Sequence, residues 1–250
     1  MKTKISWVIY CLMSLVLLQP LSAAERFVAN EGSGFVWIQQ GKAYPILIDP
    51  QEDKGVVRAV VNLQTDAGKV TGETPEIIYS AYGKRMLIVG SIENSSWIKQ
   101  LLQSGKINAA DLQGKREKYI LQTVKNPIDG VEEAVVIAGS DKRGTIYGIY
   151  ELARQMGVSP WYFWADVPVE KHDVISIKEG TYTDGEPAVK YRGIFLNDEW
   201  PSLGGWASAT FGGFNSKFYE TVFELVLRLK GNFMWPAMWN SAFYDDDPMN

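Results

Sequence analysis

The sequence is nearly free of cysteine and histidine. Its one cysteine, Cys11, lies within the first 24 residues, and its one histidine, His172, lies in the polar run "PVEKHDV". With no thiol after that point, disulfides, zinc–thiolate sites and cysteine nucleophiles are excluded from the remaining residues. A histidine in a polar run is typical of a solvated linker, so serine–histidine catalysis within these residues is disfavoured.

Long apolar runs are also scarce, and the one that exists lies at the N-terminus. It extends from Ile5 to Leu18, follows two lysines and precedes the small-residue stretch "LSAAE". The run is shorter than the ~20 residues that a membrane-spanning helix needs, and its order is typical of a secretory signal peptide. We therefore expect residues 1–24 to be removed after Ala24. The protein would then be exported to the periplasm or the extracellular space, with no membrane attachment after cleavage.

Basic residues are outnumbered by acidic ones. The sequence has 25 Lys and Arg against 29 Asp and Glu, and without the two lysines of the signal peptide 23 face 29, a net charge of −6. This balance disfavours a nucleic acid partner. The composition, 46% hydrophobic and 22% charged over 250 residues, is typical of soluble globular proteins with one large or two ordinary domains.

Residues 25–178 alternate short β-rich runs with helical runs, which predicts an N-terminal α/β domain of the sandwich type. The expected strands are "FVWI", "YPILI", "EIIYS", "MLIVGSI", "YILQTV" and "AVVIAGS". The expected helices are "KGVVRAVVNLQTDAG", "SSWIKQLLQSG" and "SDKRGTIYGIYELARQMG". Ser140 or Asp141 can cap the last helix, Gly157 can end it, and its Gly144 and Gly148 suggest close packing on the sheet. Residues 179–190, rich in Gly and acidic residues, read as a linker.

Residues 191–250 restart as a strand "YRGIFLN", a loop, a helix "SKFYETVFELVLRLKG" and a short strand "NFMWP". Ser216 is the expected helix cap and Gly231 the expected stop. The expected apolar face of this helix comprises Phe218, Val222, Leu225, Val226 and Leu229. A parallel β–α–β unit after an α/β domain suits the first part of a (β/α)8 (TIM) barrel, a fold of about 250 residues. The barrel would thus be incomplete within this sequence.

Three polar residues, Asn197, Asp198 and Glu199, stand where the first barrel strand ends. Active sites of such barrels form at the C-terminal ends of strands. Regular alternation would aim Asp198 to one face and its two neighbours to the other, so one carboxylate would serve in the site and the other would brace it. The alternative is that the cluster only caps the strand or pairs with Arg192.

Tryptophan is concentrated in the second half of the sequence. Six of the nine tryptophans lie between residues 161 and 239, namely Trp161, Trp164, Trp200, Trp206, Trp235 and Trp239. An indole ring offers a flat apolar face that suits a sugar ring, although each one alone could equally be a core residue. The acidic run "YDDDP" lacks the alternating spacing of a calcium loop and reads as a turn or helix cap.

Three long stretches resemble glycoside hydrolase family 115, the xylan α-glucuronidases. They are "GSDKRGTIYGIYELARQMGVSPWYFWADVPV", "YRGIFLNDEWPSLGGWA" and "FGGFNSKFYETVFELVLRLKGNFMWPAMWNSAFYDDDP". The resemblance implies an inverting enzyme, without a cofactor or metal, that releases glucuronic acid or 4-O-methylglucuronic acid from α-1,2 linkages on glucuronoxylan. Carboxylates would provide acid and base.

The resemblance matches Asp198 to an acidic active-site residue, and Glu199 is its catalytic candidate neighbour. The candidate substrate-binding residues are Arg192, Asn197, Trp200, Trp206, Asn232, Trp235, Trp239 and Asn240. The general acid would come from later barrel strands, so the 250 residues alone should be inactive. Homodimer formation is left open. Two other functions also stay open: a polysaccharide-binding protein without activity, and a hexosaminidase-like enzyme with the same domain order.

Overall fold

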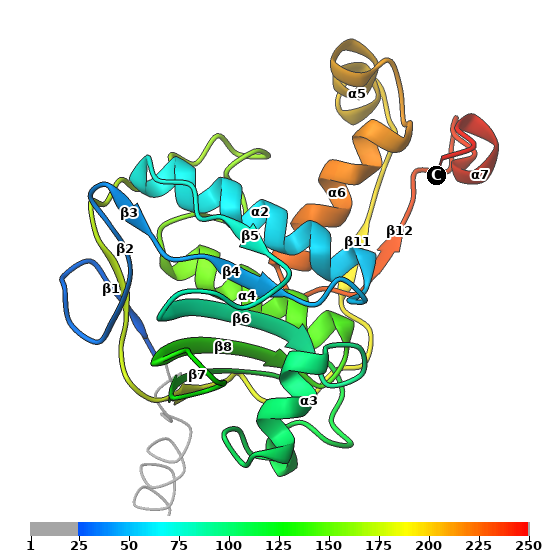
Figure 1. Ribbon diagram of the computed structural model, residues 1–250. Coiled ribbons are helices and arrows are strands. Elements are labelled where there is room, and N and C mark those ends of the chain that lie inside the picture. The colour runs from blue at the N-terminus through cyan, green and yellow to red at the C-terminus, as the bar shows by residue number, and fades with distance from the viewer. Residues whose placement is uncertain (1–24, 250) are drawn as a thin grey trace, which may run out of the picture.

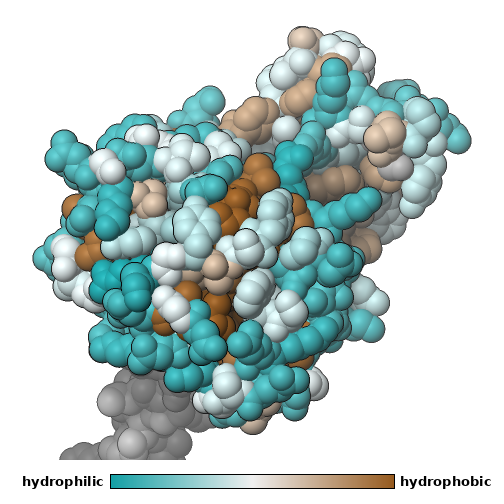
Figure 2. Space-filling model, in the orientation of Figure 1, coloured by the Kyte–Doolittle hydropathy of each residue, from teal (hydrophilic) through white to brown (hydrophobic). Residues whose placement is uncertain are grey.

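The computed structural model describes residues 25–249, so the predicted signal peptide lies outside the described residues. An α/β body, in which a central sheet lies between helices, carries an arm formed by the elements of residues 191–249 (Figure 1). Hydrophilic side chains cover much of the body in this view, whereas apolar patches show between its elements and on the arm (Figure 2). No helix within residues 25–249 has the length and hydropathy needed to cross a membrane.

The central sheet has six strands in the order β10-β7-β8-β6-β4-β5. Their bounds are β4 Ile46–Ile48, β5 Ile77–Ile78, β6 Arg85–Ser91, β7 Tyr119–Lys125, β8 Glu133–Gly139 and β10 Thr181–Tyr182. Strands β5, β4, β6 and β8 are parallel, while β7 and β10 run antiparallel to their neighbours. The sequence predicted all of these strands except β10, which lies within the predicted linker and pairs with β7.

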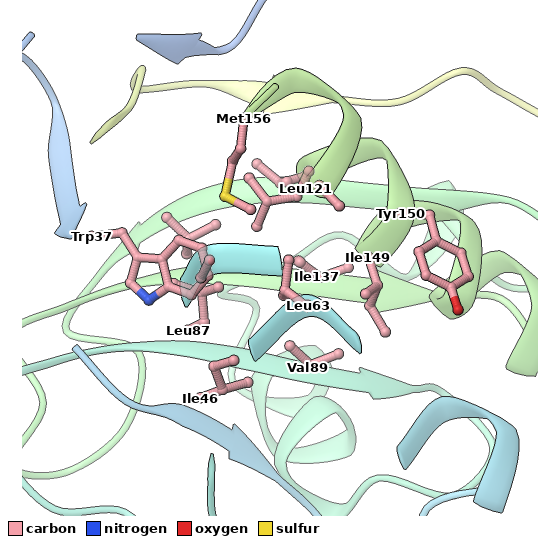
Figure 3. Close-up of a cluster of buried hydrophobic side chains, with 14 of the residues drawn as sticks. Trp37, Ile46, Leu63, Leu87, Val89, Leu121, Ile137, Ile149, Tyr150 and Met156 are labelled. Atoms are coloured by element: carbon pink, nitrogen blue, oxygen red, sulfur yellow. The ribbon is translucent and has the colours of Figure 1, made fainter. Parts of the chain in front are cut away.

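Helices cover both faces of this sheet, which makes the predicted mixed α/β architecture. Helices α2 (Lys54–Thr71) and α4 (Lys142–Gln155) lie on one face, and α3 (Ser96–Gln103) lies on the other (Figure 1). Alternate residues of β6 enter the two cores: Leu87 and Val89 face α2 and α4, and Met86 and Ile88 face α3. Figure 3 shows the first of these cores, where Leu87 and Val89 meet side chains of both helices. A short 3-10 helix, η1 (Ala109–Asp111), follows α3.

The glycines of α4 allow this helix to lie directly on the sheet. A Cβ atom at Gly144 would stand 2.2 Å from the Lys118 carbonyl oxygen, and one at Gly148 would stand 2.8 Å from Ile137. Asp141 caps the helix by accepting from the Gly144 N–H. The predicted packing role of both glycines is therefore confirmed, and Asp141 is the cap of the two candidates.

A second, four-stranded sheet lies at the edge of the body, in the order β1-β9-β2-β3. Its strands are β1 Val28–Ala29, β2 Phe35–Gln39, β3 Lys42–Ala43 and β9 Ile175–Ile177. Trp37 of β2 is fully buried and packs into the main core (Figure 3). Of these strands the sequence predicted only β2; β1, β3 and β9 are two or three residues long and were not among the expected strands.

The arm contains the predicted parallel β–α–β unit. Its elements are β11 (Gly193–Phe195), α6 (Ser216–Arg228) and β12 (Phe233–Trp235), and β11 pairs in parallel with β12. Gly193 permits this pairing, because a Cβ there would stand only 1.7 Å from the Phe233 carbonyl oxygen. This parallel start is what the first part of a barrel requires.

The ends of α6 differ from the expectation. Asn215, not Ser216, is the N-cap, and its side chain accepts from the Phe218 N–H. The chain leaves the helix at Lys230, which adopts a left-handed φ of 58°, so the predicted stop at Gly231 was wrong by one residue. Leu229 is exposed because it lies beyond the last helical turn; the other four predicted apolar positions are buried.

The segment between β11 and α6, expected to be a loop, contains helix α5 (Leu203–Phe211). Its two consecutive glycines lower its intrinsic helix propensity, and Ser202 makes no side-chain capping bond. Packing stabilises it instead: Trp206 of α5 lies 5.3 Å from Trp164, between ring centroids, and Ala207 is buried against α6. The last helix, α7 (Phe243–Asp246), occupies the predicted turn "YDDDP".

Candidate functional site

The C-terminal end of β11 presents its polar residues to two different sides. Leu196 still pairs with β12, since its N–H donates to the Trp235 carbonyl at 3.0 Å. Beyond it the alternation continues, because Asp198 is buried while Asn197 and Glu199 are exposed. The predicted divergence of the two carboxylates is therefore confirmed.

Asp198 holds the turn that follows β12. Its Oδ1 accepts from the Trp239 N–H at 3.2 Å and its Oδ2 accepts from the Asn240 N–H at 2.8 Å. Only 1% of the residue is exposed. Burial acts to raise the pKa of this carboxyl, but the N–H groups of Asn240 and Trp239 and the Ser241 hydroxyl outweigh it and leave the pKa below its usual range. The side chain is thus an ionised acceptor for backbone donors.

A hollow of about 460 Å³ opens beside this carboxylate. It lies between α5, the turn before α6 and the segment after β12, and its polar lining includes Asp198, Ser208, Asn215, Asn240, Ser241 and Asp246. Asp247, next to the lining residue Asp246, accepts from the N–H and the hydroxyl of Ser216 at the start of α6. The hollow suits a ligand rich in hydroxyl groups, because carboxylate and amide oxygens can accept several hydrogen bonds.

Trp200 and Trp239 are the two most exposed of the candidate tryptophans. Trp200 lines the hollow and is 65% exposed. Its ring lies against the first turn of α5, where a Cβ at Gly204 would stand 2.9 Å from its Nε1. Trp239, held by Asp198 through its backbone, is 72% exposed. Both indoles offer the surface that stacking on a sugar requires.

The other two candidate tryptophans have different surroundings. Trp206 packs in an aromatic cluster with Trp164, Phe211 and Phe218. Trp235 lies on the open face of β11 and β12, edge-to-face with Phe195 at 5.7 Å between centroids. Neither lines the hollow at Asp198.

The structure does not bring Arg192 and Asn232 together with Asp198. Both lie at the N-terminal ends of β11 and β12, the opposite end of the parallel pair. Arg192 pairs with Glu117 at 2.7 Å, not with the acidic cluster. The Asn232 amide donates to Glu117 at 2.8 Å and to the Lys190 carbonyl at 2.7 Å.

Sequence reasoning missed several residues of the hollow. The sequence gives no sign of the role of Gly204, which is to leave room for the ring of Trp200. Ser241 and Asp246 are far from Asp198 in sequence, although the position of "YDDDP" after a short strand was a usable signal. Among residues 25–249, no three His, Cys, Asp or Glu side chains are grouped so that they could hold a metal ion.

An α/β body followed by a parallel β–α–β unit, with a carboxylate and exposed tryptophans at the strand ends, is the arrangement that the sequence predicted for a carbohydrate-active protein. The model of glycosyl hydrolase family 115 matches residues 184–250. A solved structure described as a family GH115 4-O-methyl-α-glucuronidase with specificity for decorated arabinogalactans is 34% identical, with a TM-score of 0.69. The match covers 82% of this chain and 26% of that one. The chain therefore belongs to glycosyl hydrolase family 115.

The chain spans about a quarter of the length of that relative. A mutant β-hexosaminidase of Streptomyces plicatus, in complex with GlcNAc, is 15% identical with a TM-score of 0.45, over 80% of this chain and 31% of that one. No curated protein matches the sequence.

Proposed function

We propose that this protein contributes to a glycoside hydrolase that releases glucuronic acid or 4-O-methylglucuronic acid from a plant polysaccharide. Family membership carries the proposal, together with the 34% identity to a 4-O-methyl-α-glucuronidase. The hollow at Asp198 supports it, since the carboxylates of Asp198 and Asp246 beside the exposed indole of Trp200 suit a sugar ring. The substrate linkage that we propose is α-1,2 on xylan, and the mechanism is inversion at the anomeric carbon.

The two adjacent carboxylates have separate roles in this proposal. Asp198 braces the turn that carries Trp239 and Asn240, because both its oxygens accept backbone N–H groups. Glu199 is exposed on the other side and does not line the hollow, so a substrate that meets it would extend beyond the hollow. An inverting enzyme needs carboxyl groups about 6.5–9.5 Å apart, which leaves room for the attacking water. We therefore expect the partner of Glu199 to come from elements outside these 250 residues.

The experiment uses the full-length enzyme and measures uronic acid release from glucuronoxylan, with a decorated arabinogalactan as the second substrate. Trp200→Ala should weaken substrate binding on the order of tenfold, which corresponds to about 1.4 kcal/mol. It should leave the thermal stability nearly unchanged because the indole is largely exposed. Trp161→Ala, an exposed tryptophan outside the hollow, is the matched control.

Binding to either polysaccharide without any release of uronic acid would contradict the enzyme proposal and favour a binding protein. Release of an acetamido sugar instead would favour the hexosaminidase-like alternative. If Trp200→Ala and Trp161→Ala had equal effects on substrate binding, the hollow would not be part of the substrate-binding site.

A further inference from the structure

Glu117 of the α/β body lies at the junction between the body and the arm. The residue is 3% exposed and lies two residues before the start of β7. Its Oε2 accepts from the Arg192 guanidinium at 2.7 Å, and its Oε1 accepts from the Asn232 amide at 2.8 Å and from Arg143 at 3.4 Å. A single buried carboxylate therefore serves three donors from three elements.

Two of these donors stand directly before the two parallel strands of the arm. Arg192 precedes β11 and Asn232 precedes β12. The two residues also bond to each other, since the Asn232 Oδ1 accepts from the Arg192 N–H at 3.0 Å. Arg192 also contacts the segment before β12 through its side chain, because its Nε donates to the Lys230 carbonyl at 2.9 Å. The starts of β11 and β12 are thus joined to each other and to one acceptor in the body.

The body holds the acceptor itself in place. The backbone of Glu117 adopts a left-handed φ of 52°, which is uncommon for a residue with a side chain. Its N–H donates to Asp141 at 2.7 Å, and the same aspartate caps α4. From α4, the Tyr147 hydroxyl donates to the Gly231 carbonyl at 2.9 Å. These contacts fix the carboxylate relative to the most deeply packed helix of the body.

We propose that Glu117 is a positioning residue that sets the placement of β11 and β12, and through them the site at the far ends of these strands. At a strand's rise of about 3.3 Å per residue, the seven steps from Arg192 to Glu199 span at most roughly 23 Å. A slip of one residue in either strand would turn its side chains to the opposite face. Because the Glu117 carboxylate binds the residues before both β11 and β12, it prevents such a slip. The importance for catalysis rests on the proposed function, whereas the placement of the strands does not.

Hydrogen exchange on the present chain tests the placement without any substrate. In Glu117→Gln the shape is kept but the charge that pairs with Arg192 is lost. We expect protection to fall at least tenfold at the N–H groups of Leu196 and Asn240, and to stay within twofold at Leu87 of β6. The matched control is Glu133→Gln, because Glu133 is also buried and paired, with Arg85 at 2.7 Å, but within the body.

Asn232→Ser breaks the same junction from the arm and should give the same pattern, so the proposal stays testable if Glu117→Gln unfolds. Unchanged protection at Leu196 and Asn240 in both variants would overturn the proposal. An equal loss at Leu87, or the same arm-specific loss in Glu133→Gln, would overturn it too. In the full-length enzyme, Glu117→Gln should lower kcat on glucuronoxylan at least tenfold while Glu133→Gln leaves it within twofold. An enzyme inactive on every glucuronic acid substrate would refute the proposed function and leave the exchange result valid.

Discussion

Replacing Asp198 with asparagine changes the turn that carries Trp239 without changing the shape of the side chain. The carboxylate accepts at both oxygens, one from the Asn240 N–H and one from the Trp239 N–H. An asparagine offers one oxygen and one NH2 group, so only one of these donors keeps its acceptor. The shorter bond, to Asn240 at 2.8 Å, is the one that we expect to survive.

The size of the effect follows from the donor that is left unpaired. The Trp239 N–H is only partly buried, so losing its acceptor costs about 1 kcal/mol, the lower end of the range for an unpaired polar group. For a protein of this size that corresponds to a fall in Tm of roughly 2–4 °C, provided that the turn unfolds with the rest. Trp239 would also lose the hydrogen bond that holds its backbone next to Asn240, which lines the hollow. In the full-length enzyme we therefore expect uronic acid release to fall on the order of 100-fold.

The assay combines thermal unfolding, hydrogen exchange at Trp239 and Asn240, and kcat on glucuronoxylan. Glu199→Gln is the matched control, because it changes the exposed neighbour and should lower kcat without changing exchange in the turn.

The pKa of Asp198 lies below its usual range, so its ionised form stabilises the fold above about pH 4, and this stability is lost as the pH falls through the folded-state value. The difference in stability between wild type and Asp198→Asn should therefore disappear in acid. Wild-type exchange at Trp239 in the variant would refute the reasoning.

Gly193→Ala should separate β11 from β12, because its Cβ would stand 1.7 Å from the Phe233 carbonyl oxygen, and we expect a loss of about 1–3 kcal/mol in urea unfolding. Gly32→Ala, where no atom lies within 4 Å of the new Cβ, is its control, and equal stability of the two variants would contradict the explanation. Arg228 and Asp66 are both buried and form an ion pair at 2.8 Å. Arg228→Ala leaves Asp66 without its partner and should lower the free energy of unfolding by about 3–5 kcal/mol at pH 7. Burial already raises the pKa of Asp66, so in the variant protonation of Asp66 removes the unpaired charge. The loss of unfolding free energy should therefore shrink as the pH is lowered. A loss that stays constant with pH would contradict this explanation.

Much of the fold could be predicted because its signals are local. The runs that became β6, β7 and β8 are apolar, long enough and bounded by turns, and α2 and α4 repeat apolar residues at helical spacing. Helix α5 was missed because two glycines hide it from any estimate of propensity, and its packing on Trp164 is a tertiary contact. Strand β10 was missed because it lies in the glycine-rich, acidic segment 179–190, whose composition is typical of a linker.

For the site, the alternation of side chains after β11 could be read from the sequence, and it predicted that Asp198 and Glu199 point to opposite sides; that Asp198 is the buried one came from the fold. The sequence by itself also determined that Gly144 and Gly148 meet the sheet closely. Only the tertiary structure decided what Arg192 and Asn232 contact, since their common partner Glu117 lies 75 and 115 residues away in the chain. Likewise it decided that the acceptor oxygens of Asp198 are occupied by backbone donors 41 and 42 residues away. Alternation along a strand is set by the backbone geometry of neighbouring residues, whereas a hydrogen bond partner is set by which distant segments fold together.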